Sequence, residues 1–223
     1  MKNTVIPEVI KIDLKVKIPP ERIEFWEKIM GRISQKVQSN ELSENEANNQ
    51  RAQIVAYKEC ISTTDTLTKL HNRRGFEENI LKSMAMAKRN SLPLSLLFID
   101  ADNLKAINNL GHDKGDEFLM IISEAIKEAT RTEDLRSRWA GDEFAVSCLG
   151  ANLEEALVIA NRILEKVRSH EVAGNKVSVS IGVGEVDLSK DTDINDRLKV
   201  IDEALLKAKE TGKDKVLSVK TNV

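Results

Sequence analysis

The stretch LRSRWAGDEFAVSCL, residues 135–149, decides the fold. Two runs that alternate like β-strands, LRSRW and FAVSCL, flank the short turn AGDE, which is the pattern of a β-hairpin. Gly141 can adopt the backbone conformation that a tight turn requires. The turn also places two acids side by side, Asp142 and Glu143. One interpretation of this pair is solvated turn chemistry, and the other is a functional site.

Patterns on both sides of the hairpin predict alternating strands and helices. Apolar residues at helical spacing predict four helices, and short apolar runs predict three further strands. The helices are expected over residues 74–89, 115–130, 152–168 and 197–210, and the strands over 93–100, 177–183 and 215–219. This order is that of a ferredoxin-like, palm-type split-βαβ antiparallel sheet flanked by helices, so the expected fold class is α/β (α+β).

The N-terminal part of the chain carries different patterns. Residues 9–18 alternate apolar and polar side chains, which predicts a strand that ends at Pro19. Two apolar stripes at heptad-like spacing follow, over residues 23–37 and 47–61. They predict two amphipathic helices, each of which needs a partner to cover its apolar face.

A polar break with a capping-box pattern, Ser43-x-x-Glu46, separates these two helices. One interpretation is that the helices pack on their own domain. The other is that they form a dimerising, regulatory pair that precedes a C-terminal domain. The expected organisation is therefore a strand and two-helix segment over 1–64 and a second domain over 65–223.

The composition excludes several classes of function. The chain has 34 basic and 36 acidic residues, a formal net charge of −2, so no global charge favours a polyanion partner. Aromatic residues make up only 4%, too few to stack many nucleic-acid bases. Cys60 and Cys148 are too few for a disulfide framework or a zinc site. No apolar run approaches the roughly 18 to 20 residues that span a bilayer. We expect a cytoplasmic protein with no nucleic-acid or membrane partner.

The predicted topology brings another acid, Asp100, to the hairpin. Asp100 ends the apolar strand PLSLLFID, where an unpaired charge is costly. This strand can lie beside the hairpin, so the carboxylates of Asp100 and Asp142 would converge. Two carboxylates about 4 Å apart repel by roughly 4 kcal/mol at an effective dielectric of 20. Oxygen ligands without a His or Cys cluster favour Mg²⁺, or Mn²⁺, held together with substrate phosphates.

Five stretches together identify a family resemblance. They are DTLTKLHNRRGF (65–76), DADNLKAINNLGHDKGDEFL (100–119), AGDEF (140–144), VSVSIGVG (177–184) and DEALLKAKETGKDKV (202–216). In their order and spacing, over about two thirds of the chain, they resemble the GGDEF-domain diguanylate cyclases. The resemblance implies a homodimer that condenses two GTP into cyclic di-GMP and two pyrophosphates with Mg²⁺, each ribose 3′-hydroxyl attacking the other nucleotide's α-phosphate.

The resemblance also implies roles for individual residues. The implied metal ligands are Asp100, Asp142, Glu143 and the backbone carbonyl of Ala101. The implied catalytic residues are Gly141, Asp142, Glu143 and Lys105. The implied GTP contacts are Asn108 and Asp116 to guanine and Lys105 and Lys209 to the phosphates, with Lys213 as a further GTP-binding residue. Arg131 and Asp134 match the family's RxxD motif, which implies an inhibitory site for the product, cyclic di-GMP.

The chain departs from the family pattern at several positions. Ala140 replaces the first glycine of the signature, which requires a backbone conformation suited to an L-residue there. The other departures are Lys213 for Arg, Leu206 for Tyr, Asn109 for Asp, and Lys69 and His71 within the usual LTGLPNR. None of them removes an implied metal ligand or guanine contact, so we expect activity.

Two alternatives belong to other classes of function. A degenerate module could bind cyclic di-GMP through Arg131 and Asp134 as a receptor, which loss of an active-site acid would have favoured. A different palm-like nucleotidyl cyclase or polymerase is disfavoured by Asn108 and Asp116 and by the shortage of basic surface.

Overall fold

A computed structural model describes residues 23–189 and 194–219 of the chain. The chain divides into two compact units, Met1–Ser62 and Thr63–Val223. The strand predicted over residues 9–18 lies outside the described residues. Among the helices of the described ranges, none has the length and apolar character needed to cross a membrane.

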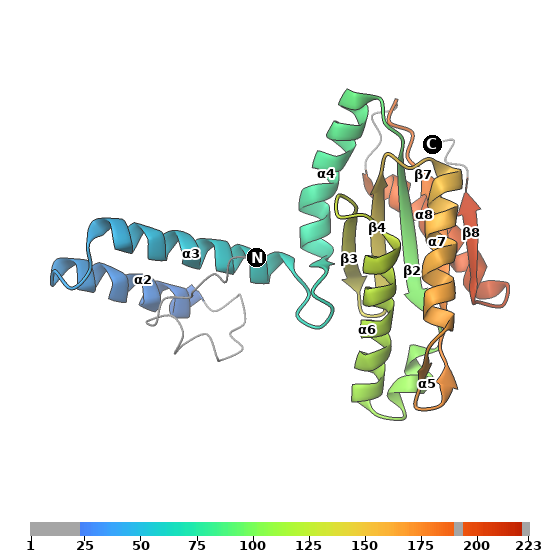
Figure 1. Ribbon diagram of the computed structural model, residues 1–223, viewed down its shortest axis with the longest axis horizontal. Helices are drawn as coiled ribbons and strands as arrows, with labels where there is room; N and C mark the ends of the chain where they lie inside the picture. The colour runs from blue at the N-terminus through green and yellow to red at the C-terminus, as the bar shows by residue number, and fades with distance from the viewer. Residues whose placement is uncertain (1–22, 190–193, 220–223) are drawn as a thin grey trace. The chain divides into compact units, whose positions relative to one another are not determined.

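The first unit contains two helices, α2 (Ile23–Gln38) and α3 (Glu44–Thr63), joined by a short turn (Figure 1). The predicted capping box is confirmed: the backbone N–H of Ser43 donates to Glu46 at 3.0 Å, and the backbone N–H of Glu46 donates to the Ser43 hydroxyl at 3.4 Å. Ile33 and Ala47 are buried between the two helices, and the partly buried residues around them are Ile29, Met30, Val37 and Leu42.

The second unit is built on a six-stranded sheet with the order β1-β3-β4-β2-β7-β8. The strands are β1 (His71–Asn72), β2 (Leu94–Ala101), β3 (Leu135–Ala140), β4 (Glu143–Leu149), β7 (Val179–Glu185) and β8 (Lys215–Val219). The inner pairs β3–β4, β4–β2 and β2–β7 are antiparallel, as the split-βαβ prediction requires. The edge strands β1 and β8 pair in parallel, so the whole sheet is mixed.

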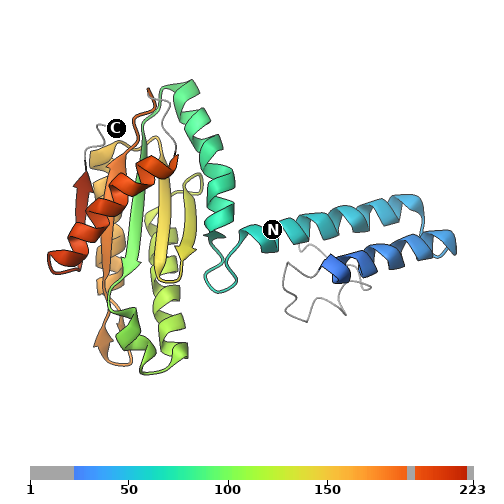
Figure 2. The ribbon, with the colours of Figure 1, turned by 180° about the vertical axis from the view of Figure 1, so that it is seen from behind.

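Helices cover both faces of this sheet. Helices α6 (His112–Ala129) and α7 (Leu153–Arg168) cover the face towards the viewer in Figure 1, and α8 (Ile194–Glu210) crosses the face seen in Figure 2. Helix α4 (Arg73–Asn90) shares an apolar cluster with α8. The short helix α5 (Leu104–Asn108) follows β2. A separate two-stranded hairpin, β5 (Glu171–Val172) and β6 (Asn175–Lys176), precedes β7.

Strand β2 is buried along its whole length because helices cover both of its faces. Leu96 and Phe98 pack in the cluster of α4 and α8, whereas Leu97 and Ile99 pack in that of α6 and α7. By this alternation Asp100 lies on the α4 and α8 face. The strand therefore delivers one charged side chain to the end of a buried, apolar surface.

Gly182 on β7 sets how closely α8 approaches the sheet. A Cβ atom at this position would lie 2.5 Å from the Ile201 carbonyl oxygen and 2.7 Å from the Leu205 nitrogen. Because both are backbone atoms of the helix, only a glycine permits this packing distance. The position of α8 matters for the site, since the helix carries Lys209 near its end.

Candidate active site

The AGDE turn closes the hairpin of β3 and β4 through the pair Ala140 and Glu143, with a register irregularity just before it. Gly141 has a φ of +47°, in the left-handed region that favours glycine. A Cβ atom there would meet nothing within 4 Å, so the turn needs this glycine for its conformation and not for packing. Ala140 ends β3 in an extended conformation, which suits an L-residue.

Arg138 ties this turn to the start of the second unit. Its Nε donates to the carbonyl oxygen of Gly141 at 2.8 Å, and its guanidinium pairs with Asp65 at 3.3 Å. Asp65 also accepts hydrogen bonds from the backbone and hydroxyl of Thr68. Although burial opposes the shift, these hydrogen bonds and the charge of Arg138 lower the pKa of Asp65. The sequence assigned no role to either member of this ion pair.

The three predicted acids converge at the end of β2. Asp100 lies directly opposite Glu143 in the β2–β4 ladder, which places both side chains on one face of the sheet. The backbone N–H of Ala101 donates to the carbonyl oxygen of Asp142 at 3.1 Å. Asp100 is only 6% exposed. Its burial raises its pKa to about 6, the charges of Asp142 and Glu143 add to the rise, and Lys209 opposes it.

Lys209 supplies a positive charge to this cluster. Its Nζ atom lies 2.7 Å from Oδ2 of Asp100. Burial alone would lower the pKa of Lys209, but the hydrogen bond and the charge of Asp100, with those of Asp142 and Glu143, raise it. Burial also raises the pKa of Glu143, and Lys209 again opposes the rise. Lys209 therefore faces three carboxylates, and Arg73 adds a weaker positive charge near Glu143, while Asp202 adds a negative one, so the site keeps an excess of negative charge.

The carboxylate oxygens fit a divalent cation whose coordination shell is completed by phosphates. Within the described ranges, no group of three or more His, Cys, Asp or Glu side chains is arranged to hold a metal ion by itself. Mg²⁺ is usually held by one or two carboxylates together with substrate phosphates and water. The buried oxygens of Asp100, with further acids beside them, suit that partial coordination.

Asp102 fixes the chain where it leaves β2, a role that the sequence analysis missed. It is 5% exposed and accepts hydrogen bonds from the hydroxyls of Ser178 and Ser180, at 2.8 and 2.7 Å, and from the backbone N–H of Asp214 at 3.0 Å. The loop of Asp214 also carries Lys213, whose Nζ donates to Asn103 at 2.6 Å. Two serines spaced two apart on a predicted strand were the available signal, since such residues share a face.

The two predicted guanine contacts, Asn108 and Asp116, both lie next to Gly115. An ideal Cβ atom on Gly115 would lie 1.8 Å from Oδ1 of Asn108, so the Asn108 side chain occupies the space that Gly115 leaves open. Asp116 follows directly in α6 and is exposed, as is Lys105 on α5. The pair lies at the same end of the sheet as Asp100, because α5 continues directly from β2 (Figure 1).

The Arg131 and Asp134 motif lies at the other end of β3, in the loop that precedes the strand and not on the strand itself. The six residues of β3, about 20 Å at 3.3 Å per residue, separate it from the turn. The backbone N–H of Arg131 donates to Asp134 at 2.7 Å, and burial raises the pKa of Asp134. The exposed Arg131 borders a pocket of about 480 Å³ that Arg162 also lines.

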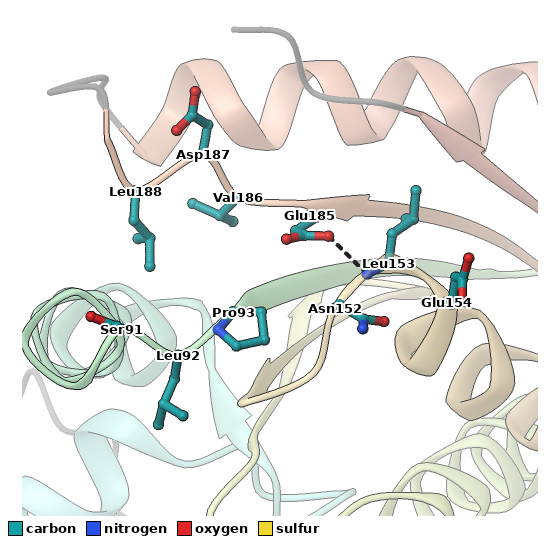
Figure 3. A pocket seen from close by; sticks show the side chains of 10 residues that line it. All are labelled: Ser91, Leu92, Pro93, Asn152, Leu153, Glu154, Glu185, Val186, Asp187 and Leu188. Atoms are coloured by element: carbon teal, nitrogen blue, oxygen red, sulfur yellow. Dashed lines mark hydrogen bonds between the residues drawn. The ribbon is translucent and has the colours of Figure 1, made fainter.

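A larger pocket, of about 890 Å³, lies at the start of β2 and the end of β7, far along the strands from the acids (Figure 3). Its lining residues are Ser91, Leu92, Pro93, Asn152, Leu153, Glu154, Glu185, Val186, Asp187 and Leu188. Glu185 accepts a hydrogen bond from the Leu153 backbone at 2.9 Å. None of the residues predicted from the sequence lines this pocket, so its size alone does not mark the candidate site.

Comparison with known proteins agrees with the resemblance. Residues 62–215 match the family described as diguanylate cyclase, GGDEF domain. The chain is 36% identical over 156 residues to the diguanylate cyclase DosC of Escherichia coli K12, a match that covers 68% of this chain and 34% of DosC. The chain thus spans about a third of the length of this relative.

Solved structures share the fold. The coiled coil and GGDEF domain of DgcB from Caulobacter crescentus, in complex with c-di-GMP, matches with a TM-score of 0.74 at 22% identity, over 82% of this chain and 100% of that one. Diguanylate cyclase SiaD from Pseudomonas aeruginosa, in complex with its activator SiaC, matches with a TM-score of 0.67 at 27% identity, over 94% and 82%. Because the family match covers more than half of its length, the chain belongs to the GGDEF-domain diguanylate cyclase family.

Proposed function

We propose that the protein is a diguanylate cyclase that condenses two GTP molecules into cyclic di-GMP and two pyrophosphates. The observation that carries the proposal is the pairing of buried Asp100 with Glu143, beside Asp142, at one end of the sheet. The family match supports it. All three acids are retained, which disfavours a receptor that only binds the product.

In this proposal the acidic end of the sheet holds the triphosphate. Asp100, Asp142, Glu143 and the Ala101 carbonyl would hold Mg²⁺, with Mn²⁺ as a substitute. A bound divalent cation would polarise the α-phosphate and neutralise the leaving pyrophosphate. Gly141 lets the turn backbone approach the phosphates, because the space above it is open. Lys105, Lys209 and Lys213 add positive charge around the phosphate chain.

Asn108 and Asp116 would select guanine. A carboxylate can accept from the N1–H and N2–H₂ groups of guanine, and an amide offers one donor and one acceptor. Adenine lacks that pair of donors and would leave the carboxylate without its partners. Discrimination of this kind can be large, because the wrong base leaves polar groups unpaired.

The reaction requires two copies of the site, since each holds one GTP. In each half-reaction a ribose 3′-hydroxyl oxygen bonds to the α-phosphorus of the other nucleotide, the bond to the β-phosphate oxygen breaks, and the hydroxyl proton is released. We propose that α2 and α3 bring two chains together. Deleting residues 1–62 should then lower the specific rate and make it rise with enzyme concentration, by mass action. Full, concentration-independent activity would exclude this role for the helices.

Arg131 and Asp134 would form a product-binding site outside the acidic cluster. Two features support this: the exposed guanidinium of Arg131 at the border of a pocket, and the planar fork of arginine, which suits a phosphate. The cytoplasmic location expected from the sequence stays a prediction.

The test is to incubate the full chain with Mg²⁺ and GTP and to identify the products by chromatography. We expect cyclic di-GMP and pyrophosphate in a 1:2 ratio, and neither product from Asp142→Asn, whose amide cannot supply the charge that holds Mg²⁺. Glu143→Gln should be severely impaired. Binding of cyclic di-GMP without any turnover of GTP would favour the receptor instead.

A further inference from the structure

The ion pair between Lys209 and Asp100 is not what a simple phosphate contact requires. The Nζ atom of Lys209 lies 2.7 Å from Oδ2 of Asp100, and this carboxylate is the most buried of the three acids in the cluster. A lysine reserved for phosphate would serve equally well pointing into solvent. Here the ammonium occupies an oxygen that the proposed function gives to the metal ion.

We propose that Lys209 is an exchangeable counter-ion: it neutralises Asp100 when no metal ion is bound, gives up that position to the divalent cation, and then binds the triphosphate. The proposal rests on the function proposed above and adds an order of events to it. Metal and nucleotide would strengthen each other's binding. The metal ion frees Lys209 for the phosphates, and the phosphates keep Lys209 away from Asp100.

Without a metal ion, the cluster of acids needs such a counter-ion. Asp142 and Glu143 stand beside Asp100, and Asp202 on α8 adds further negative charge near Glu143. Buried like charges destabilise a fold unless a cation is paired with them. Lys209 supplies that cation before any metal is present.

The ammonium and the metal ion compete for the same place. Mg²⁺ binds a carboxylate oxygen at about 2.0–2.1 Å, so an ammonium 2.7 Å from that oxygen would stand within about 5 Å of the metal. Two cations that close in a mostly buried site repel strongly. Metal binding therefore displaces Lys209 from Asp100.

The Lys209 side chain can leave Asp100 without any movement of α8. Gly182 lets the backbone of α8 pack closely against β7. The Lys209 side chain is 33% exposed and has a flexible four-carbon stem, so its ammonium can swing outwards to where phosphates would lie. The exchange needs only a change of side-chain rotamer.

The decisive variant is Lys209→Met, because the counter-ion role predicts effects of opposite sign on the two ligands. Binding of Mn²⁺ alone to the full chain, followed by the electron paramagnetic resonance of free Mn²⁺, should tighten by about tenfold or more, as expected when a charged hydrogen bond no longer competes. Binding of the unreactive analogue guanosine 5′-[α,β-methylene]triphosphate should weaken. Lys207→Met, an exposed lysine on the same helix, is the matched control and should change neither.

Unchanged or weaker Mn²⁺ binding by Lys209→Met would overturn the proposal and leave Lys209 as a phosphate contact only. If that variant does not fold, the wild-type chain gives the answer by ¹⁵N NMR. The Lys209 Nζ signal, assigned by its loss in Lys209→Arg, should shift when Mg²⁺ alone saturates the site, and an unmoved signal would overturn the proposal.

The outcome is separable from that of the proposed function. If Lys209→Met binds Mn²⁺ more tightly but the wild-type chain makes no cyclic di-GMP, the counter-ion proposal stands and the cyclase proposal fails. If the wild-type chain makes cyclic di-GMP but Lys209→Met binds Mn²⁺ as the wild type does, the cyclase proposal stands and the counter-ion proposal fails.

Discussion

Asp100 and Asp134 are equally buried, at 6% exposure each, yet they stand in opposite kinds of surroundings. Asp134 accepts hydrogen bonds from the backbones of Arg131 and Leu149 and so closes a turn. Asp100 pairs with the flexible ammonium of Lys209 and has two further carboxylates beside it. Burial raises the pKa of both groups, so burial alone does not reveal function. What differs is whether the partners are backbone groups or a flexible charged side chain.

The strongest test of this contrast is Asp100→Asn. The amide keeps the shape of the side chain but loses the charge, so we expect the rate of cyclic di-GMP synthesis to fall by about 10²- to 10³-fold or more. The urea denaturation curve should stay close to that of the wild type. A rate within a few-fold of wild type would show that Asp100 has no part in the reaction.

Arg131→Ala tests the other end of the sheet. A charge-assisted contact between Arg131 and a product phosphate is worth roughly 1.5 to 3 kcal/mol, so the variant should weaken inhibition by added cyclic di-GMP by about 10- to 150-fold. Initial-rate titrations measure this, with Arg74→Ala, an exposed arginine on α4, as the control. Superimposable inhibition curves for Arg131→Ala and wild type would show that the motif is only part of a turn.

Asp134→Ala should affect stability and not the chemical step. Removing the carboxylate leaves backbone N–H groups of the turn without their acceptor, which should lower the free energy of unfolding by about 1–3 kcal/mol. Urea denaturation of Asp134→Ala and Asp100→Asn, compared with wild type, checks this. Equal midpoints for the two variants would remove the distinction between the acids.

Gly115→Ala has the smallest expected effect and extends the contrast to the guanine contact. The added methyl group would displace the Asn108 amide, which should weaken GTP binding by about 2- to 10-fold, the worth of one hydrogen bond. The melting temperature should not fall, because alanine favours a helix over glycine by about 1 kcal/mol. Unchanged GTP affinity, measured by calorimetry with the unreactive analogue, would mean that Asn108 does not read the base.

The sequence predicted what depends on local pattern. Residues 135–149 formed the expected hairpin, the inner strands paired antiparallel as the split-βαβ order required, and Asp100 met Glu143 through that pairing. The two-residue strands β1, β5 and β6 were not predicted, because two residues carry no measurable period. The pairing of β1 at the edge of the sheet depends on its contact with β3, which lies more than 60 residues further along the chain.

The missed features of the site depend on contacts that residue type and spacing do not show. The pairing of Lys209 with Asp100 joins residues on different elements, and the packing of α8 on the sheet brings them together. Asp134 was read as half of a ligand-binding motif, and its hydrogen bonds to the turn were not foreseen. Residue type and spacing indicate which groups can bind a ligand, but they do not show which of them the fold already uses.

The hydrogen bonds of Asp102 have a consequence for how the protein is made. Its partners Ser178, Ser180 and Asp214 lie 76, 78 and 112 residues further along the chain. Contacts over such separations are slow to form, because a long loop must close first. A nascent chain that has not reached Ser178 already contains Asp100, Asp142 and Glu143 but lacks every bond that fixes Asp102. The acidic end of the sheet can therefore acquire all of these hydrogen bonds only after Asp214 has been synthesised.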